Sequence, residues 1–509
     1  MKTKGVLMTR RYQVVFFTAC VAATLAWSAT ATASQKYYVS PTGDDNADGT
    51  TKKKAWRTLD RVAQQIFAAK DRILLQGGGV FPGSIQLSPD NSAGNIEIGT
   101  YDQGRAVIDA GNGPGIIISN LSGVKITSLE IRGSGQQSNT ADGILIVSEV
   151  DPIPPNTIHY SDFVIDDVEV HDFKYFGIYI HSHWGTGLND ARVTNVVSHD
   201  NGLEGITVIA DEFPGTPNED MYIGNCLAYH NHGTRGLPQH SGSGIVLGGV
   251  NRGTIEYCEA YENGDQSDAY ETGGPVAIWA WNSQSVTIQF CKAHRQSTAN
   301  NADGGAYDLD GATFNSVIQY NVSWDNYGYG PQLYDFFWGP HLNNVVRYNV
   351  SIGDCKGQRP GTGALTAFGN LNNETFDHNI VYVENEGGSD VRFVQINEWP
   401  GDGLVYRDNV YLAGTSITPF DAADATGTNL AMFNNLYFFA DQALPFTWNN
   451  TTYNTIDEWR AATGLDANSQ FFFGPFPPRV QMLRDGMEAL KQEPVLRPEM
   501  FHALFDLIR

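Results

Sequence analysis

Two aspartates spaced two residues apart, Asp308 and Asp310, are the first candidates for chemistry in this chain. If the segment GGAYDLDG forms a strand, both carboxyl groups lie on one face, with α-carbons about 6.5–7 Å apart. Such a pair can act as the acid and base of glycosidic cleavage, by an inverting or a retaining route according to the carboxyl separation. Two like charges this close also raise one pKa, which keeps one carboxyl protonated. The alternatives are a Ca²⁺ site or a solvated strand end.

The preceding segment offers aromatic partners for these acids. Aligning GPVAIWAWN with GGAYDLDGA places Trp279 beside Asp308 and Trp281 beside Asp310, all on the outer face, with Tyr307 and Leu309 turned inward. Flat rings are platforms on which sugar rings can lie. The next segment, GPQLYDFF, adds further side chains to the same sheet. The predicted substrate-binding residues on these three segments are Trp279, Trp281, Tyr307, Gln332 and Tyr334.

A second polar group is predicted on another strand of the same turns. If Cys291 points inward, Lys292 and His294 point outward, beside Glu259 and Tyr261 of the preceding turn and Ser323 and Asp325 of the next. Arg295 and Asp303 lie in the loops that join the two faces, and long loops on a rigid scaffold often carry specificity. We therefore count His294 and Asp303 as further catalytic candidates, and Lys292 and Arg295 as substrate-binding candidates. The commoner alternative is a surface ion-pair network.

Histidines are crowded farther upstream. His181 and His183 flank one serine, and His230 and His232 flank one asparagine, so each pair can share one face of a strand. Zinc would accept two such imidazoles, but no motif supplies a third ligand. Solvent-facing turn histidines are the favoured interpretation. His199 and His240 are candidates for lining a substrate groove that extends towards the N-terminal turns.

A repeat of about 30 residues must position all of these side chains. Segments such as ARVTNVVSHDN, GTIEYCEAYEN and VVRYNVSIGD recur at separations of 28 to 33 residues, and each unit adds a strand pattern such as GILIV or GITVI. Short alternating strands without helices between them predict a coil of stacked parallel strands. We predict an all-β fold, a parallel β-helix of about ten turns. Cys226, Cys258 and Cys291 occupy one repeat position, which predicts an internal stack, and the repeated asparagines predict a turn ladder.

The ends of the chain differ from the repeat. Residues 1–33 have the basic, apolar and small-residue regions of a signal peptide, so we expect a secreted protein cleaved near Ala33. Residues 34–75 predict a strand and a capping helix, 76–445 the coil, and 446–509 a C-terminal capping and helical segment.

Composition limits the partners. The net charge of the chain is −24, and removing 1–33 takes away four of 32 basic residues and no acid, which leaves about −28. Such a charge argues against nucleic-acid binding. The mature segment holds no run of about 20 apolar residues, which argues against a membrane span. We expect a monomer that acts on a polysaccharide or oligosaccharide, with no required cofactor and with Ca²⁺ as an optional ion.

The opening YYVSPTGDDNADGTTKKKAWRTLDRVAQ resembles that of secreted right-handed parallel β-helix carbohydrate-active proteins of the pectate-lyase-like superfamily. GGPVAIWAWNSQSVTIQFCKAHRQ and ADGGAYDLDGATFNSVIQYNVSWDN resemble its β-helix-repeat subgroup. The resemblance covers about residues 35–475 and implies the right-handed coil. The superfamily includes hydrolases, lyases and epimerases, so it fixes the fold better than the reaction. Certain lyases carry a catalytic lysine soon after the related motif, whereas this chain has no lysine from 293 to 355.

Three function classes follow. The leading hypothesis is a glycoside hydrolase of neutral or weakly charged glycans that uses Asp308 and Asp310. The second is a polysaccharide lyase or epimerase, in which His294, Lys292, Arg295 or Tyr307 abstracts a proton beside a uronate carboxylate. The third is a glycan-binding surface protein without turnover.

Overall fold

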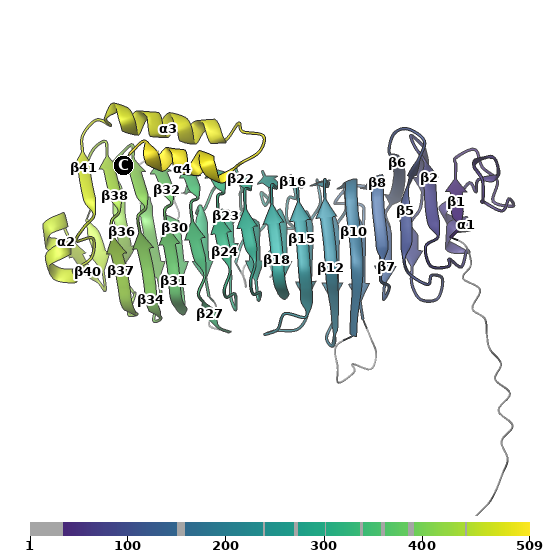
Figure 1. Ribbon diagram of the computed structural model, residues 1–509, viewed down its shortest axis with the longest axis horizontal. Coiled ribbons are helices and arrows are strands. Elements are labelled where there is room, and N and C mark those ends of the chain that lie inside the picture. The colour runs from purple at the N-terminus through teal and green to yellow at the C-terminus, as the bar shows by residue number, and fades with distance from the viewer. Residues whose placement is uncertain are drawn as a thin grey trace, which may run out of the picture. The chain divides into compact units, whose positions relative to one another are not determined.

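The computed structural model describes residues 34–149, 158–237, 240–268, 273–300, 302–335, 339–357, 362–384, 391–442 and 445–508. Residues 34–509 belong to one compact unit, built from parallel strands in two sheets (Figure 1). The coil is a parallel β-helix of about 12 turns, which confirms the predicted fold and corrects the turn count from ten. The predicted signal peptide, 1–33, lies outside the described residues. Among the described helices, none has the length and apolar character required to cross a membrane.

One sheet of 14 strands, called the site sheet below, forms one side of every turn. In spatial order it contains β4 (Ile85–Leu87), β7 (Ile116–Ser119), β9 (Ile144–Ser148), β11 (Ile178–Ser182), β14 (Ile206–Ala210), β17 (Ile245–Gly248), β20 (Val276–Trp281), β23 (Gly305–Leu309), β26 (Pro331–Tyr334), β30 (Gly363–Phe368), β33 (Arg392–Asn397), β36 (Thr418–Ala422), β39 (Phe446–Trp448) and β40 (Thr451–Tyr453). All neighbours pair in parallel except β39 and β40, which are antiparallel.

The second sheet has 27 strands and forms the other sides of the coil. Its strands are β1 (Lys36–Val39), β2 (Arg72–Gln76), β3 (Val80–Pro82), β5 (Ile96–Tyr101), β6 (Ala106–Gly111), β8 (Val124–Gly133), β10 (Ile158–His171), β12 (Thr186–Thr194), β13 (Val197–His199), β15 (Asn218–Gly224), β16 (Leu227–Tyr229), β18 (Val250–Glu256), β19 (Glu259–Tyr261), β21 (Thr287–Gln289), β22 (Lys292–His294), β24 (Val317–Gln319), β25 (Val322–Trp324), β27 (His341–Leu342), β28 (Val345–Arg347), β29 (Val350–Ile352), β31 (Leu371–Asp377), β32 (Ile380–Val383), β34 (Asp402–Arg407), β35 (Val410–Ala413), β37 (Thr428–Phe433), β38 (Leu436–Phe439) and β41 (Gln470–Phe473). A typical middle turn therefore contributes two short strands here and one to the site sheet.

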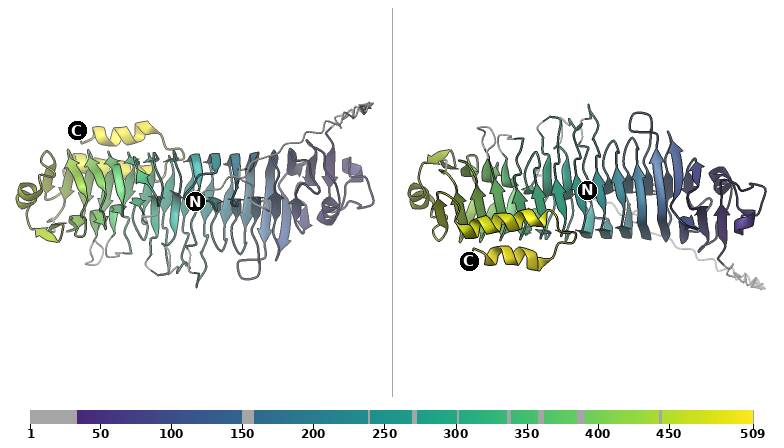
Figure 2. Two further views of the ribbon diagram at one scale, coloured as in Figure 1. Left: turned by 90° about the horizontal axis from the view of Figure 1, so that it is seen from below. Right: turned by 90° about the horizontal axis from the view of Figure 1, so that it is seen from above.

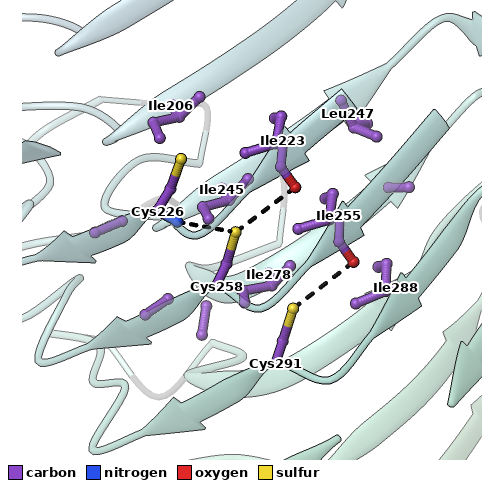
Figure 3. Close-up of a cluster of buried hydrophobic side chains, with 14 of the residues drawn as sticks. Ile206, Ile223, Cys226, Ile245, Leu247, Ile255, Cys258, Ile278, Ile288 and Cys291 are labelled. Carbon is purple, nitrogen blue, oxygen red and sulfur yellow. Dashed lines mark hydrogen bonds between the residues drawn. The ribbon is translucent and has the colours of Figure 1, made fainter. Parts of the chain in front are cut away.

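The core runs through the inside of the coil, where every second side chain of each strand points. Cys226, Cys258 and Cys291 are buried free thiols stacked on consecutive turns, surrounded by isoleucines from the neighbouring strands (Figure 3). The Cys258 thiol donates to the carbonyl of Ile223 at 3.7 Å. This arrangement confirms the predicted internal stack of small side chains.

The asparagines that were predicted to form one turn ladder occupy two different positions of the repeat. Asn195 and Asn225 have φ of 53° and occupy the left-handed corner before a strand, as a turn residue would. Asn321 instead follows Cys291 in the internal stack, because its side chain accepts the Cys291 amide hydrogen at 2.9 Å. It donates to Asn349 at 3.0 Å, and further buried asparagines continue the stack. The predicted placement of Lys292 beside Ser323 was therefore wrong by one residue, because Val322 is its partner.

The helix predicted to close the N-terminal end is short. Only Leu59–Ala63 forms a helix, α1, with the Thr58 side chain as its N-cap. The later part of the predicted segment is β2, which pairs with β1 and β5 because backbone pairing along the sheet outweighs its helical spacing. Trp56 and Phe67 are buried beside α1 and complete the cap.

The C-terminal segment does more than close the coil. β39 and β41 continue the sheets past residue 445, and α2 (Ile456–Thr463) follows β40. The chain then turns back, and α3 (Pro478–Leu490) and α4 (Pro498–Asp506) lie along one side of the coil (Figures 1 and 2). Their buried residues form one apolar cluster with strands β25, β29, β32, β35 and β38. We call residues 478–508 the C-terminal arm.

Candidate active site

Three neighbouring strands bring the predicted side chains together on the outer face of the site sheet. In the register of β20, β23 and β26, Trp279 lies beside Asp308, and Asp308 beside Gln332. The alternate residues Tyr307 and Leu309 belong to the interior core. Asp308 therefore points outward, as the alignment predicted.

Asp308 is nevertheless covered, with only 2% of its surface exposed. Its Oδ2 accepts hydrogen bonds from Gln332 Nε2 at 3.0 Å and from the Tyr329 hydroxyl at 3.3 Å. Its Oδ1 is buried without a hydrogen-bond partner among the described residues. Burial raises the pKa of Asp308 well above its usual range, and the charges of Asp310 and Asp303 add to the effect. Burial thus favours the protonated form of Asp308.

Asp310 follows the end of β23 and is 9% exposed. Its amide donates to the carbonyl of Ala280, which keeps it in register with the end of β20. Its Oδ1 accepts from the Gly311 amide at 2.6 Å. Burial raises the pKa of Asp310 to about 8, although the Gly311 hydrogen bond opposes that change. Asp310 is therefore a carboxylic acid that can keep its proton near neutral pH.

Asp303 belongs to the loop before β23 and is half-buried. Its carboxylate accepts from the Tyr329 hydroxyl at 3.3 Å and from the Gly274 amide. Tyr329 thus contacts both Asp303 and Asp308, and its ring is buried against Trp279. The loop carboxylate and the strand carboxylate share one hydroxyl group.

A cleft of about 220 Å³ opens beside Asp303, whereas Asp308 and Asp310 are not among its lining residues. Within it, Tyr334 stacks on Phe368 with ring centroids 4.3 Å apart. The cleft is lined by Asp303, Tyr329, Gln332, Tyr334, Thr362, Thr366, Phe368, Asn397, Glu398 and Asp424. Sequence reasoning predicted Asp303, Gln332 and Tyr334 but missed Tyr329, Thr362, Thr366, Phe368, Asn397, Glu398 and Asp424. The register would have identified Phe368, because it pairs with Tyr334, whereas the two acids lie in turns without a repeat signal.

Removal of the Tyr334 ring should weaken glycan binding at this cleft. We expect Tyr334→Ala to raise the KM for an oligosaccharide by about tenfold, equivalent to about 1.4 kcal/mol, because the stacked pair loses half of its apolar surface. Tyr334→Phe keeps that surface and should bind nearly as well as the wild type. Equal losses in both variants would show that the hydroxyl group, and not the ring, carries the contact.

Trp279 is not an open platform. It is 4% exposed, its indole nitrogen donates to Ser243 Oγ at 3.1 Å, and the His240 ring meets it edge-on at 5.0 Å. The predicted sugar platform at this position is wrong, because the side chains of His240 and Tyr329 cover the indole. Trp281 is half-buried and faces Phe213 with centroids 5.9 Å apart. Trp281 therefore remains a candidate for contact with the substrate.

His240 links this aromatic group to an acidic partner. Its Nδ1 lies 3.1 Å from Oε1 of the buried Glu204. Burial disfavours the charged form of His240, but Glu204 outweighs it, so the pKa is raised. The positive charge of His240 in turn lowers the pKa of Asp310, which burial has raised. His240 thus belongs to the electrostatic environment of the acids.

Tyr307 cannot contact a substrate in this structure. It is fully buried inside the coil, and its hydroxyl donates to the carbonyls of Cys291 and Val322, each at 2.9 Å. The inward orientation that the alternation predicts is observed. Its inclusion among substrate-binding residues is therefore corrected.

The second polar group lies on a different sheet from the aspartates. His294 is 4% exposed, stacks between Tyr261 and Trp324, and its Nε2 lies 2.9 Å from Glu259. Burial lowers the pKa of His294. Arg295 is bound to Glu262 at 2.6 Å. The register also places Trp324, and not Asp325, beside His294, because Asn321 and not Val322 follows Cys291 in the stack. These contacts remove the geometric support for a lyase base here.

Lys292 holds the C-terminal arm. Its ammonium donates to the carbonyls of Lys491 at 3.0 Å and Glu493 at 2.7 Å, so its predicted role in substrate binding is also corrected. Lys292→Met should lose these two charged hydrogen bonds, each worth about 1.5–3 kcal/mol, and release the link between α3 and α4. We expect faster amide hydrogen exchange in the arm. Unchanged exchange would show that the apolar contacts of the arm suffice.

Three clusters among the described residues have the composition of a metal site. They are Glu169, His171 and His199, then His181, His183 and Asp211, and finally Asp377, His378 and Asp408. None of these clusters includes Asp308 or Asp310, so the calcium interpretation of the aspartates stays a prediction.

Comparisons with known proteins bear on the fold. No family model and no curated protein matches the chain. A GH136 lacto-N-biosidase from Eubacterium ramulus matches with a TM-score of 0.52 at 18% identity, over 74% of this chain and 67% of that one. The chain shares the parallel β-helix fold of carbohydrate-active proteins. Pectate lyase Pel9A also matches, with a TM-score of 0.37 at 16% identity over 69% of this chain and 78% of that one. DFA-IIIase from Arthrobacter chlorophenolicus A6 matches with a TM-score of 0.39 at 12% identity, over 65% and 84%.

Proposed function

We propose that this chain is a secreted glycoside hydrolase of neutral or weakly charged glycans. The observation that carries the proposal is a carboxylic acid with a pKa of about 8, Asp310, at the end of β23. The neighbouring strand β26 carries Tyr334, which lies in a cleft with a stacked aromatic ring and carboxylates. The lacto-N-biosidase with the same fold is in keeping with it. Hydrolysis needs one protonated carboxyl group and one ionised carboxylate at the scissile bond. The raised pKa of Asp310 supports the first role, and the place of Asp303 in the cleft makes it our candidate for the second.

The environments of the three acids suggest different roles. Asp310 would donate the proton to the leaving oxygen, because it is the more exposed of the two acids whose pKa is raised. Asp303 lines the cleft and would supply the carboxylate that activates water or attacks the sugar. Asp308 is enclosed by Tyr329 and Gln332, so it would act as a positioning residue.

The class of reaction can be tested by product analysis. The mature chain would be incubated with neutral oligosaccharides and polysaccharides and, separately, with uronate polymers. Hydrolysis releases reducing ends without a new double bond, whereas a lyase produces an ultraviolet-absorbing unsaturated product. Unsaturated product from a uronate polymer would overturn the proposal, and binding without any product would indicate a glycan-binding protein.

The pH dependence of kcat/KM should report the acid. A general acid must be protonated, and burial raises the pKa of Asp310 to about 8, so activity should fall as the pH rises through about 8. Initial rates between pH 5 and about 10, at substrate concentrations below KM, would measure this limb. An alkaline limb that is unchanged in Asp310→Asn would assign it to another group.

A further inference from the structure

Two histidines and one aspartate on neighbouring turns of the site sheet form a compact group upstream of the acids. His181 is on β11, and His183 is the first residue after that strand. Asp211 comes just after β14, and its amide donates to the Ser182 carbonyl at 2.9 Å, which places it beside His183. The side chains of His183 and Asp211 are 41% and 31% exposed, and that of His181 is 13% exposed, so each keeps some surface open to solvent.

The ligand atoms of this group converge. His181 Nε2 lies 2.8 Å from Asp211 Oδ1, and His183 Nδ1 lies 2.8 Å from Asp211 Oδ2. One nitrogen from each ring and one carboxylate oxygen lie within 4.8 Å of one another. The other nitrogen of His183, Nε2, lies 3.8 Å from Glu149, where a carboxylate could orient the ring as outer partners of metal ligands do.

The other two clusters are less suited to a metal ion. His171 and His199 stack with their rings nearly parallel, 6° apart, and the Nδ1 of each lies 2.7 Å from the aspartate that follows it. In the third cluster, His378 Nδ1 lies 2.6 Å from Asp377. In both of these clusters each histidine already has a carboxylate next to it in sequence, whereas Asp211 bridges two rings from a different turn.

We propose that His181, His183 and Asp211 form a binding site for Zn²⁺ or a similar first-row divalent ion. Two imidazoles and one carboxylate are the ligands that such ions prefer over Ca²⁺ or Mg²⁺, and water would take the fourth position of a tetrahedral site. The acidic surface of the chain favours cation binding. Because the ligands come from two turns, the ion would bind adjacent turns to each other. The site is four strands from β23, about 19 Å along the sheet, so it is separate from the acids.

Titration calorimetry of Zn²⁺ into the chelator-treated mature chain would test the site, together with the absorption spectrum of bound Co²⁺. We expect one tight site with a tetrahedral Co²⁺ spectrum and a melting temperature that rises with Zn²⁺. His183→Ala should weaken binding by about 100-fold or more, and Glu149→Gln by about tenfold. Asp211→Asn keeps a hydrogen-bonding group of similar size, and should also weaken binding strongly.

His230→Asn is the matched control, because His230 is 42% exposed and lies outside the three clusters. Its φ of 51° suits asparagine. The control should keep the Zn²⁺ affinity of the wild type. Absence of stoichiometric binding, or a loss caused by His171→Ala and not by His183→Ala, would overturn the proposal. Each variant would be checked by circular dichroism, so that unfolding is not counted as lost binding.

Discussion

Asp310→Asn is expected to lower kcat/KM for a natural glycan by about 10²–10⁴-fold, because it removes the proton donor. The expected loss is much smaller for an aryl glycoside whose leaving group departs without protonation. Asp303→Asn should reduce the hydrolysis of both substrates, since the carboxylate is needed whatever the leaving group. Rates on the two substrates for both variants measure this contrast. A large loss on both substrates in Asp310→Asn would contradict the assignment of the acid.

Stability measurements separate this loss of activity from unfolding. The folded-state pKa of Asp310 is raised to about 8, above its ordinary value of 3.8, so its contribution to stability is present below about pH 4 and is lost as the pH rises through about 8. Asparagine cannot ionise, so the variant should lose less stability than the wild type over this range. Melting temperatures of the wild type and of Asp310→Asn at several pH values test whether stability changes with pH in this direction. Asp190→Asn, at an exposed corner with φ of 51°, is a control that should change neither property.

The repeat predicted the coil and the direction of its side chains because both follow from alternation along short strands. Tyr307 and Leu309 point inward and Asp308 points outward, and the pairing of Trp279 with Asp308 follows from adding one turn. The cysteine stack was predictable for the same reason. Such features depend only on local period and on strand spacing.

Features that depend on irregular segments could not be predicted in this way. The cover over Trp279 comes from His240 and Tyr329, whose loops have no period that would indicate where they fold. Alternation also gave Lys292 an outward direction but not its partner, because the C-terminal arm that binds it is about 200 residues away in sequence. The register error at Asn321 arose because asparagine serves both as a corner residue and as an internal stacking residue.

The buried Glu374 should be among the most sensitive structural positions near the acids. Its Oε1 lies 2.9 Å from His341 Nδ1, and its Oε2 accepts the Asn344 amide hydrogen at 2.7 Å. His341 Nε2 in turn lies 3.0 Å from the carbonyl of Leu309, the residue before Asp310. Both His341 and Glu374 have no exposed side-chain surface. The pair therefore supports the end of β23 from β27 and β31, two strands of the second sheet.

Glu374→Ala is expected to destabilise the chain by about 3–5 kcal/mol, because it leaves a buried imidazole and a buried amide without their acceptor. Glu374→Gln keeps one acceptor oxygen and the volume, so its loss should be smaller. Turns of a coil can open separately, so a melting temperature alone does not locate the loss of stability. Amide hydrogen exchange should therefore be measured in addition to thermal denaturation. We expect lost protection to be concentrated at β23, β27 and β31, with reduced activity as Asp310 loses its support. Uniform loss of protection along the coil would show instead that Glu374 stabilises the whole unit and has no particular link to the acids.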